Sequence, residues 1–393
     1  MNVLMAWELG DGLGHTVKLS LVGEQLTRKG HHVGYALRNT QTAQTLEFDP
    51  AIEVYAAPAM SILNPEQRAA YDYSDLLLIR GYENSKRLDD RIDAWLRIFD
   101  RHKTDLVVAD HAPCARLAAH IAGITSHAIG TGFAVPPLTS PLHPFIDPRD
   151  SDLPLQARLE RRLDEAINGA LKRYRKPEVE RTVAIFIGGK RFLCTVEEID
   201  GYKGRVDETF YGPLLRVSDG ARPHWPDGEG PRVFIYLYQD APLLPVALAS
   251  LDRAGIATLV YQGNAASDRK LEATGPNTII SNSPVNLSQL AGCDLVICQG
   301  GPSTLIISLL QGIPVLTYPR HVEQLMTCRQ LLETGLGGML TGVVKESQVL
   351  QTIESMINDE SLRSRAEAFS SRYQSLITEG IAENIATSII DHA

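Results

Sequence analysis

The chain has 393 residues, a formal net charge of −9 and 44% hydrophobic residues. Its length exceeds the size at which one hydrophobic core usually stops growing, which predicts two domains. The acidic balance argues against nucleic acid as a main partner.

Five cysteines are scattered along the chain, and none has the CxxC or Cys/His spacing of a zinc site. An odd number would leave one unpaired in a disulfide scheme, so reduced thiols and a cytoplasmic location are expected. The N-terminus does not resemble a signal sequence, and no apolar stretch approaches the roughly 20 residues that span a bilayer. Neither a metal site nor a transmembrane segment is therefore expected, and the oligomeric state stays open.

Strands alternate with helices through the first half of the chain. Apolar runs predict strands at 2–9, 31–37, 52–58, 104–110 and 125–130, and amphipathic runs predict helices at 15–30, 87–103 and 115–123. This alternation predicts a parallel, doubly wound α/β sheet.

A proline-rich segment, residues 133–155, follows and is expected to lack regular structure. The next segment, 156–176, predicts a helix rich in arginine and lysine. Two interpretations of this basic helix stay open. It can be a solvated face, or it can make an electrostatic contact with an acidic or membrane-bound acceptor.

Residues 216–231 are polar and dense in glycine and proline, which predicts a linker between two domains at 1–215 and 230–393. Beyond the linker the alternation starts afresh, with strands at 232–238, 257–263, 277–282, 294–299 and 314–319 and helices at 244–255, 285–293, from 303, and 322–335. A helical tail begins near residue 346, and its last helix is free to pack back on the N-terminal domain.

The sequence CQGGPST forms a glycine-rich turn between a strand and a helix, starting at Cys298. Free N–H groups at the positive end of a helix favour phosphate, and glycine permits close approach. Ser303 and Thr304 would add hydroxyl donors, and Pro302 suits the first helical turn. The alternative is a tight turn in which a hydroxyl merely caps the helix.

The first glycine turn, ELGDGLGH, departs from a dinucleotide-binding fingerprint and instead presents His15 after the first strand. Active sites of open α/β sheets lie at the carboxyl ends of strands, and imidazole can act there as a general base. Asp110 closes the 104–110 strand and would orient that imidazole. The alternatives are N-cap roles for both residues. His111 and His127 are expected to be packing or surface residues.

Together these features resemble the GT-B fold glycosyltransferases, in particular the nucleotide-sugar-dependent family of antibiotic-tailoring and plant secondary-metabolite enzymes and the lipid II-forming MurG. The likeness covers most of the chain. GLGHTVKLSLVGEQLTRKGHHVGYA looks like the family's opening GH-x-x-P-x-x-x-L-A-x-x-L-x-x-x-GH-x-V, and DLVVADHAPCARLAAHIAGI looks like the segment that carries the paired aspartate. SPVNLSQLAGCDLVICQGGPSTLIISLLQGIPVLTYPRHVEQ resembles the donor-binding signature.

The resemblance implies two doubly wound Rossmann-like domains that face each other across a cleft, the first for the acceptor and the second for a nucleotide sugar. By the same resemblance, His15 would be the catalytic base and Asp110 its partner. Donor-binding roles would fall on Val285 and Asn286 at the nucleobase, Gln299, Gly300, Gly301, Ser303 and Thr304 at the diphosphate, and Glu323 and Gln324 at the sugar hydroxyls.

The implied reaction is inverting, metal-independent transfer of a hexosyl group from a UDP- or dTDP-sugar, with no separate cofactor. The acceptor, whether a small molecule, lipid-linked or other, is not named by the resemblance. Two positions depart from the family pattern. Gln299 stands where the family usually has a histidine, and Ile307 stands where plant and MurG-type members have a ribose-gripping glutamate, so uridine and thymidine both stay open.

Two other functions remain as alternatives. One is a UDP-sugar 2-epimerase on the same fold, which the Gln299 turn fits poorly. The other is a non-catalytic relative that holds a nucleotide sugar or serves as a scaffold for a partner enzyme, against which the pair His15 and Asp110 speaks.

Overall fold

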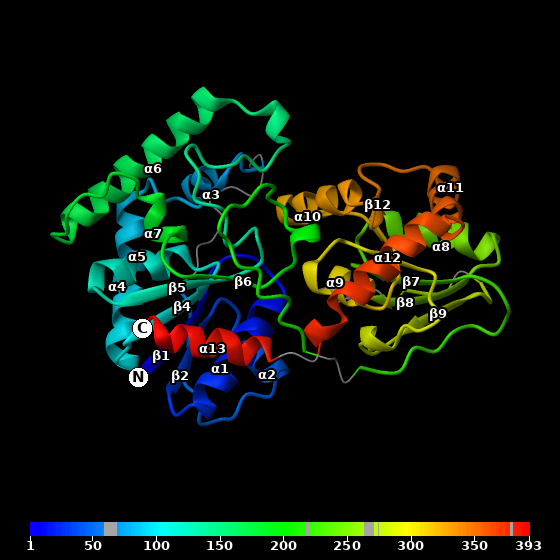
Figure 1. Cartoon of the computed structure of the whole chain (residues 1–393), viewed down its shortest axis with the longest axis horizontal. Coiled ribbons are helices and arrows are strands. Elements are labelled where there is room, and N and C mark those ends of the chain that lie inside the picture. Colours follow the sequence, from blue (N-terminus) through cyan, green and yellow to red (C-terminus); the bar gives the residue numbers. More distant parts are fainter. Residues whose placement is uncertain (59–68, 217–219, 263–270, 274, 378–379) are drawn as a thin grey trace. The chain divides into compact units, whose positions relative to one another are not determined.

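The computed structural model describes residues 1–58, 69–216, 220–262, 271–273, 275–377 and 380–393. The chain divides into two compact units, Met1–Leu215 with Gly380–Ala393, and Arg216–Glu379. Each unit contains a six-stranded parallel sheet with helices on its faces (Figure 1). The segment predicted as a linker begins the second unit, and its residues 217–219 lie outside the described part of the chain.

The first sheet has the strand order β3-β2-β1-β4-β5-β6. Its strands are β1 (Asn2–Trp7), β2 (His32–Leu37), β3 (Val54–Ala56), β4 (Leu106–Asp110), β5 (Thr125–Gly130) and β6 (Arg191–Leu193). The helices of this unit are α1 (Gly14–Arg28), α2 (Gln41–Thr45), α3 (Tyr73–Ile79), α4 (Ser85–His102), α5 (Pro113–Ala122), α6 (Leu153–Arg173), α7 (Val183–Ile187) and α13 (Ile381–Asp391). Short 3-10 turns, η1 (Pro148–Asp150) and η2 (Glu197–Ile199), complete it.

Helix α4 shows why the sequence forms these elements. Leu88, Ile92, Trp95 and Phe99 recur at helical spacing and are almost fully buried, so one face of the helix packs onto the sheet. The side chain of Asn84 caps its first turn by accepting from the amide of Arg87.

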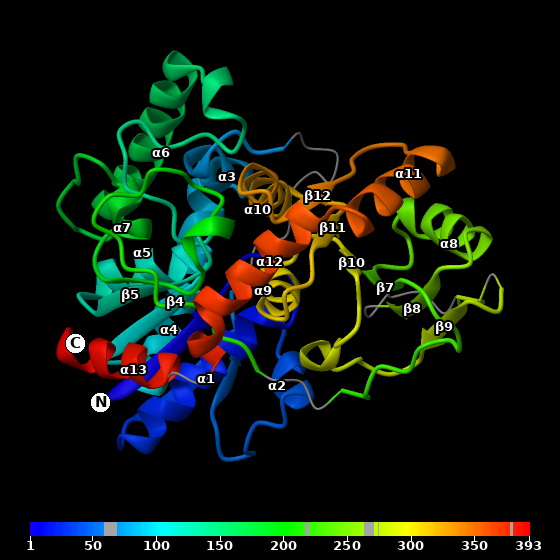
Figure 2. The ribbon, with the colours of Figure 1, turned by 45° about the vertical axis from the view of Figure 1, so that its right-hand side comes forward.

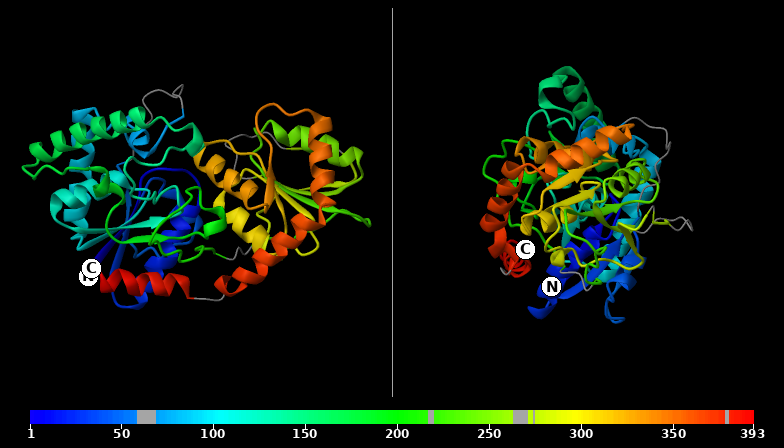
Figure 3. Two further views of the ribbon diagram at one scale, coloured as in Figure 1. Left: turned by 45° about the horizontal axis from the view of Figure 1, so that its top comes forward. Right: turned by 90° about the vertical axis from the view of Figure 1, so that its right-hand side faces the viewer.

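Helix α13, the last of the chain, packs against α1, so the closing segment belongs to the same unit as the N-terminus. Figure 3 shows both chain ends on this unit, with α13 in red beside α1 in blue. The apolar side chains of α13 that are buried include Ile385 and Ile389, which explains why a segment so distant in sequence is held there.

The second sheet has the strand order β12-β11-β10-β7-β8-β9. Its strands are β7 (Arg232–Leu237), β8 (Ala257–Gln262), β9 (Thr278–Ser281), β10 (Leu295–Cys298), β11 (Val315–Thr317) and β12 (Gly337–Met339). The helices are α8 (Leu243–Arg253), α9 (Pro302–Leu310), α10 (Val322–Glu333), α11 (Glu346–Ile357) and α12 (Glu360–Tyr373), with 3-10 turns η3 (Leu287–Gln289) and η4 (Gln374–Ile377). Helices α8 and α11 pack together with the sheet in one apolar cluster, and α9 and α12 pack together elsewhere in the unit (Figure 2).

Counted within its own unit, each sheet follows the order 3-2-1-4-5-6 of the doubly wound fold. The order reverses between β1 and β4 in the first sheet and between β10 and β7 in the second. Ligands of such sheets bind outside the carboxyl ends of the strands at this switch point. The fold therefore marks one expected binding region in each unit.

Several expected elements differ from the structure. The helix expected at 285–293 is only the 3-10 turn η3, because Asn286 caps it and Cys293 already leads into β10. Strands β6 and β12 and helices α2, α3 and α7 were not expected from the sequence. Within the described residues, no helix is both long and apolar enough to cross a membrane.

Candidate functional site

Two segments of the first unit meet at its switch point. Strands β1 and β4 are neighbours, and Trp7, the last residue of β1, pairs in register with Asp110, the last residue of β4. After Trp7 the chain makes the glycine turn and enters α1 at Gly14, which places His15 in the first helical turn. The two residues predicted to form a pair thus leave the sheet at neighbouring strand ends.

The structure brings this pair together. Nδ1 of His15 lies 3.0 Å from Oδ2 of Asp110, and the Asp110 side chain is fully buried. A third group reaches the same oxygen, since Nζ of Lys18 lies 3.2 Å from Oδ2. Burial raises the pKa of the Asp110 carboxyl, but the charges of His15 and Lys18 outweigh that effect and hold it below its usual range. Asp110 is therefore a buried carboxylate shared by two nitrogen groups.

Trp7 and Gly10 are further neighbours of the His15 ring. Trp7 stacks on it with ring centroids 5.1 Å apart and an interplanar angle of 16°. A Cβ atom at Gly10 would lie 2.5 Å from Nε2 of His15, and Gly10 has φ +87°. Glycine at this position therefore keeps open the side of the imidazole that carries Nε2, the nitrogen turned away from Asp110.

Glu8, which follows β1, connects this strand end to the start of α5 and to α4. Its Oε2 accepts from the amide of Cys114 at 2.7 Å, and its Oε1 accepts from Nε1 of Trp95 at 2.9 Å. Helix α5 has no side-chain cap of its own at Ala112, so Glu8 satisfies the start of the helix that follows Asp110. Burial raises the pKa of the Glu8 carboxyl to about 7, against the opposing effect of these hydrogen bonds and Arg91.

His111 lies directly beside the pair with a left-handed backbone, φ +47°. Its ring is buried among aromatic neighbours, 5.6 Å from Phe133 and 6.3 Å from Tyr73 by ring centroids. Neither ring nitrogen has a hydrogen-bond partner among the described residues. Burial, followed by the positive charge around it, lowers the pKa of His111 to about 3, so this histidine is neutral. It is a packing residue, as expected, but one in a strained conformation.

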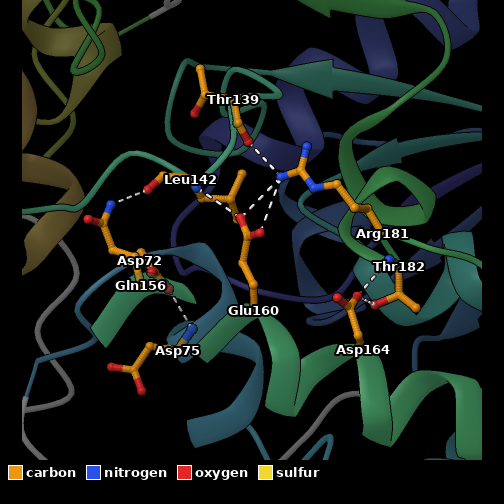
Figure 4. Close-up of polar contacts among 9 residues, drawn as sticks. All are labelled: Asp72, Asp75, Thr139, Leu142, Gln156, Glu160, Asp164, Arg181 and Thr182. Carbon is orange, nitrogen blue, oxygen red and sulfur yellow. Dashed lines mark hydrogen bonds and ion pairs between the residues drawn. The ribbon is translucent and has the colours of Figure 1, made fainter. Parts of the chain in front are cut away.

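The proline-rich segment is held by polar side chains of its own unit (Figure 4). Nε2 of Gln156 donates to the carbonyl of Leu142, the amide of Leu142 donates to Glu160, and Arg181 donates to the carbonyl of Thr139 at 2.6 Å. The basic helix α6 is tied down in the same way. Two of its arginines form paired hydrogen bonds with acidic side chains, Arg162 with Glu83 and Arg173 with Asp89.

In the second unit the predicted donor turn follows β10, again at the switch point. Gly301 is the N-cap of α9, and no side chain caps the helix. Ser303 and Thr304 occupy the second and third helical positions, where Ser303 is exposed. The alternative in which a hydroxyl merely caps this helix is therefore wrong, because the N-cap residue is a glycine, which has no side chain to cap the helix.

Gln299 is nearly buried in front of this turn, with 9% of its surface exposed. Its side-chain Nε2 is buried without a hydrogen-bond partner in the described part of the chain. An unsatisfied buried donor costs free energy. The glutamine therefore places an unused N–H group beside the helix start.

The remaining predicted donor residues lie on the loop after β9 and in the first turn of α10, both in the second unit. Val285 forms a parallel bridge with Ala221, whose carbonyl accepts from the amide of Asn286 at 2.9 Å. In such a bridge the amide and carbonyl of Val285 itself point to the opposite side. The Asn286 side chain is turned inward and accepts from Ser288.

Glu323 and Gln324 start helix α10. Glu323 is half-buried in the first turn, and Oε1 of Gln324 accepts from the amide of Arg320 at 2.9 Å. Arg320 in turn makes paired hydrogen bonds of 2.6 and 2.8 Å to Asp240, which follows β7. These contacts connect the loops after β7 and β11 within the second unit.

All five cysteines are buried and unpaired. Within the described residues, no cluster of three or more His, Cys, Asp and Glu side chains could hold a metal ion.

Curated relatives match the chain over nearly its full length. An uncharacterised glycosyltransferase of Methanosarcina acetivorans is 24% identical over 381 residues, which is 93% of this chain and 92% of that protein. The zeaxanthin glucosyltransferase of Pseudescherichia vulneris is 22% identical and covers 89% of both chains. No protein-family model matches the chain.

Solved structures agree in fold. The calicheamicin glycosyltransferase CalG4 superposes with a TM-score of 0.73 at 17% identity, covering 99% of this chain and 97% of its own. The glycosyltransferase VinC, solved in complex with dTDP, gives 0.69 at 13% identity over the full length of both chains. The chain is a glycosyltransferase of GT-B fold. The fold class expected from the sequence is confirmed.

Two contacts around the His15–Asp110 pair were missed from the sequence. Lys18 stands where the family's opening motif has proline, and the sequence shows this mismatch. The sequence does not show that Lys18 contacts Asp110. Glu8 gave no signal, because a glutamate before glycines is typical of an exposed turn. Only the fold brings it to the start of α5.

Proposed function

We propose that this glycosyltransferase performs inverting transfer from a nucleotide sugar, with His15 as the base and Asp110 as its orienting partner. The observation that carries the proposal is the 3.0 Å contact between His15 and the buried Asp110 at the switch point of the first sheet. Nε2, on the open side of the ring, would take the proton of the acceptor nucleophile as it attacks the anomeric carbon. Asp110 would stabilise the imidazolium that forms.

The donor diphosphate is proposed to bind at the start of α9. The uncapped helix end offers the amides of Ser303 and Thr304, the two hydroxyls and the unused Nε2 of Gln299. These groups stabilise a departing diphosphate, on which negative charge grows in the transition state. Helix and hydroxyls would supply this stabilisation without a metal ion.

Further donor contacts are proposed for the second unit. The outward backbone of Val285 and the neighbouring Asn286 would meet the nucleobase. Gly301, where a Cβ atom would meet nothing within 4 Å, would let the phosphates approach, and Gly300 would supply the positive φ of the turn before it. Glu323 and the amide nitrogen of Gln324 would contact sugar hydroxyls, since Oε1 of Gln324 is already used by Arg320. A dTDP complex of a structural neighbour supports a UDP- or dTDP-sugar as donor.

The alternative is a non-catalytic relative that binds the donor only. A panel of UDP- and dTDP-sugars separates the two functions, with binding measured by thermal shift and turnover by nucleoside diphosphate release. His15→Ala should retain the donor-dependent shift and lose turnover, while His120→Ala, at an exposed histidine of α5, should retain both. No shift with any donor would refute the donor site. Full turnover in His15→Ala would refute the base.

A further inference from the structure

Lys18 and His15 lie three residues apart in α1, so their side chains leave the helix on the same side. Both contact Oδ2 of Asp110, at 3.2 Å from Nζ and 3.0 Å from Nδ1. Nζ also donates to the carbonyl of Gly14 at 3.2 Å, which fixes the ammonium in place. Lys18 is 8% exposed, so solvent screens this ion pair poorly.

This ammonium weakens the stabilisation that Asp110 gives to protonated His15. A lone buried carboxylate stabilises an imidazolium strongly, whereas a carboxylate already paired with an ammonium stabilises it less. The other groups that act here do not restore the negative charge. His111 is neutral and Arg80 adds positive charge. Protonation of His15 therefore places a second cation beside one anion.

We infer that Lys18 is a positioning residue that adapts the site to acceptors with an acidic hydroxyl, of the phenol type, rather than an alkanol. This inference rests on the proposed base role of His15. An acidic hydroxyl needs less help from the base, and the positive charge of Lys18 favours its developing phenolate. An alkanol needs a fully stabilised imidazolium, which the shared carboxylate does not supply.

The chemical step balances without a further reactant. The phenolic oxygen forms a bond to the anomeric carbon, and the bond from that carbon to the diphosphate oxygen breaks. The nucleoside diphosphate leaves with the electron pair, and the phenolic proton passes to Nε2 of His15. No group is oxidised or reduced.

The test compares acceptors that share one ring, namely 4-nitrophenol, 4-methylphenol and 4-methylbenzyl alcohol, with each donor that the protein binds. In the native protein, kcat/KM should fall in that order, by about 100-fold from first to last. Lys18→Met removes the charge at similar length and should compress this span about tenfold, mainly because the benzyl alcohol reacts faster. Lys18→Arg keeps the charge and should keep the preference.

Several outcomes would overturn the inference. One is that the native protein transfers the sugar to 4-methylbenzyl alcohol as fast as, or faster than, to the two phenols. Another is that neither phenol raises the rate of nucleoside diphosphate release above the rate measured without an added acceptor. A folded Lys18→Met variant with an unchanged span would do the same. If Lys18→Met fails to fold, the acceptor order of the native protein still decides. Donor binding and His15-dependent turnover, measured separately, show whether the proposed function itself has failed.

Discussion

Nδ1 of His15 and Oδ2 of Asp110 lie 3.0 Å apart, although the two residues come from segments 95 positions apart in the chain. The contact exists because β1 and β4 are neighbours at the point where the strand order reverses. The first turn of α1 and the end of β4 thus place an imidazole and a carboxylate together.

The first prediction concerns the carboxylate itself. Asp110→Asn keeps the size of the side chain but removes the charge that stabilises protonated His15, so kcat should fall by about 100-fold or more. The thermal shift caused by the donor should be unchanged, because the residues proposed to bind the donor belong to the second unit. A variant with native kcat would show that Asp110 serves only the stability of the fold.

The second prediction uses two glycines of the same turn. A Cβ atom at Gly10 would meet Nε2 of His15 at 2.5 Å, whereas at Gly12 it would meet nothing within 4 Å. Both have positive φ, +87° and +96°, so Ala at either position costs similar backbone strain, about 1–2 kcal/mol. Gly10→Ala should therefore lose at least about tenfold more kcat than Gly12→Ala at comparable Tm. Equal losses in the two variants would contradict an open Nε2 side.

The pair itself could be predicted from sequence because it depends on local patterns. His15 follows an apolar strand and a glycine turn, and Asp110 ends a second apolar strand, so periodicity alone places both at strand ends. The shortest strands could not be predicted in this way. Strands β6 and β12 each have three residues, too few for a period of two to be recognised.

Lys18 and Glu8 escaped prediction for a different reason. A lysine on an amphipathic helix and a glutamate in a glycine turn are typical of solvent-facing residues. Their burial comes from partners far along the chain, Asp110 for Lys18 and the start of α5 for Glu8. Charged groups are buried when they are paired, and pairing is decided by the fold.

The third prediction separates the two glycines of the donor turn. Gly300 has φ +87°, and a Cβ atom there would lie 2.3 Å from Sγ of Cys328, so Gly300→Ala should destabilise the second unit by about 2–4 kcal/mol. Gly301 has φ −64° and ψ 130°, and a Cβ atom would meet nothing within 4 Å. Gly301→Ala should cost at most about 1 kcal/mol of stability.

Donor binding should respond in the opposite order. A methyl group at Gly301 projects into the space where the diphosphate is proposed to approach the helix, so Kd for the donor should rise about tenfold, or ~1.4 kcal/mol. Isothermal titration of the folded variant with UDP or dTDP measures this change. Unchanged affinity in Gly301→Ala would move the diphosphate away from this turn.

The last prediction concerns Asp72, the N-cap of α3, whose carboxyl has its Oδ1 bonded to the amide of Asp75 at 2.8 Å. Its Oδ2 is buried without a hydrogen-bond partner among the described residues. Burial, with the charges of Asp75 and Glu160 adding to it, raises the pKa of this carboxyl to about 7. The backbone of Asp72 forms an antiparallel bridge with Pro144 of the proline-rich segment. Figure 4 shows Asp72 together with Thr139 and Leu142 of that segment.

A folded-state pKa above the unfolded value means that the native state binds the proton more tightly. The resulting stability is complete below about pH 4 and is lost as the pH rises through about 7. Asp72→Asn keeps the cap and cannot ionise, so its stability should exceed that of the native protein by about 1–2 kcal/mol near pH 5 and by about 4 kcal/mol near pH 8.5. The stability of Asp72→Asn should still depend on pH, but less than that of the native protein, because burial also raises the pKa of Glu8 to about 7.

Calorimetric Tm at several pH values checks this expectation. Asp72→Ala is the matched control, because it removes the cap together with the charge and its stability should lie about 1 kcal/mol below that of Asp72→Asn at every pH. The carboxyl would be excluded as the source of the pH dependence if the Tm curves of Asp72→Asn and the native protein ran parallel from about pH 5 to about pH 8.5. A difference between Asp72→Asn and the native protein that widens as the pH rises identifies ionisation of a buried group, since the hydrogen bond to Asp75 is kept by asparagine.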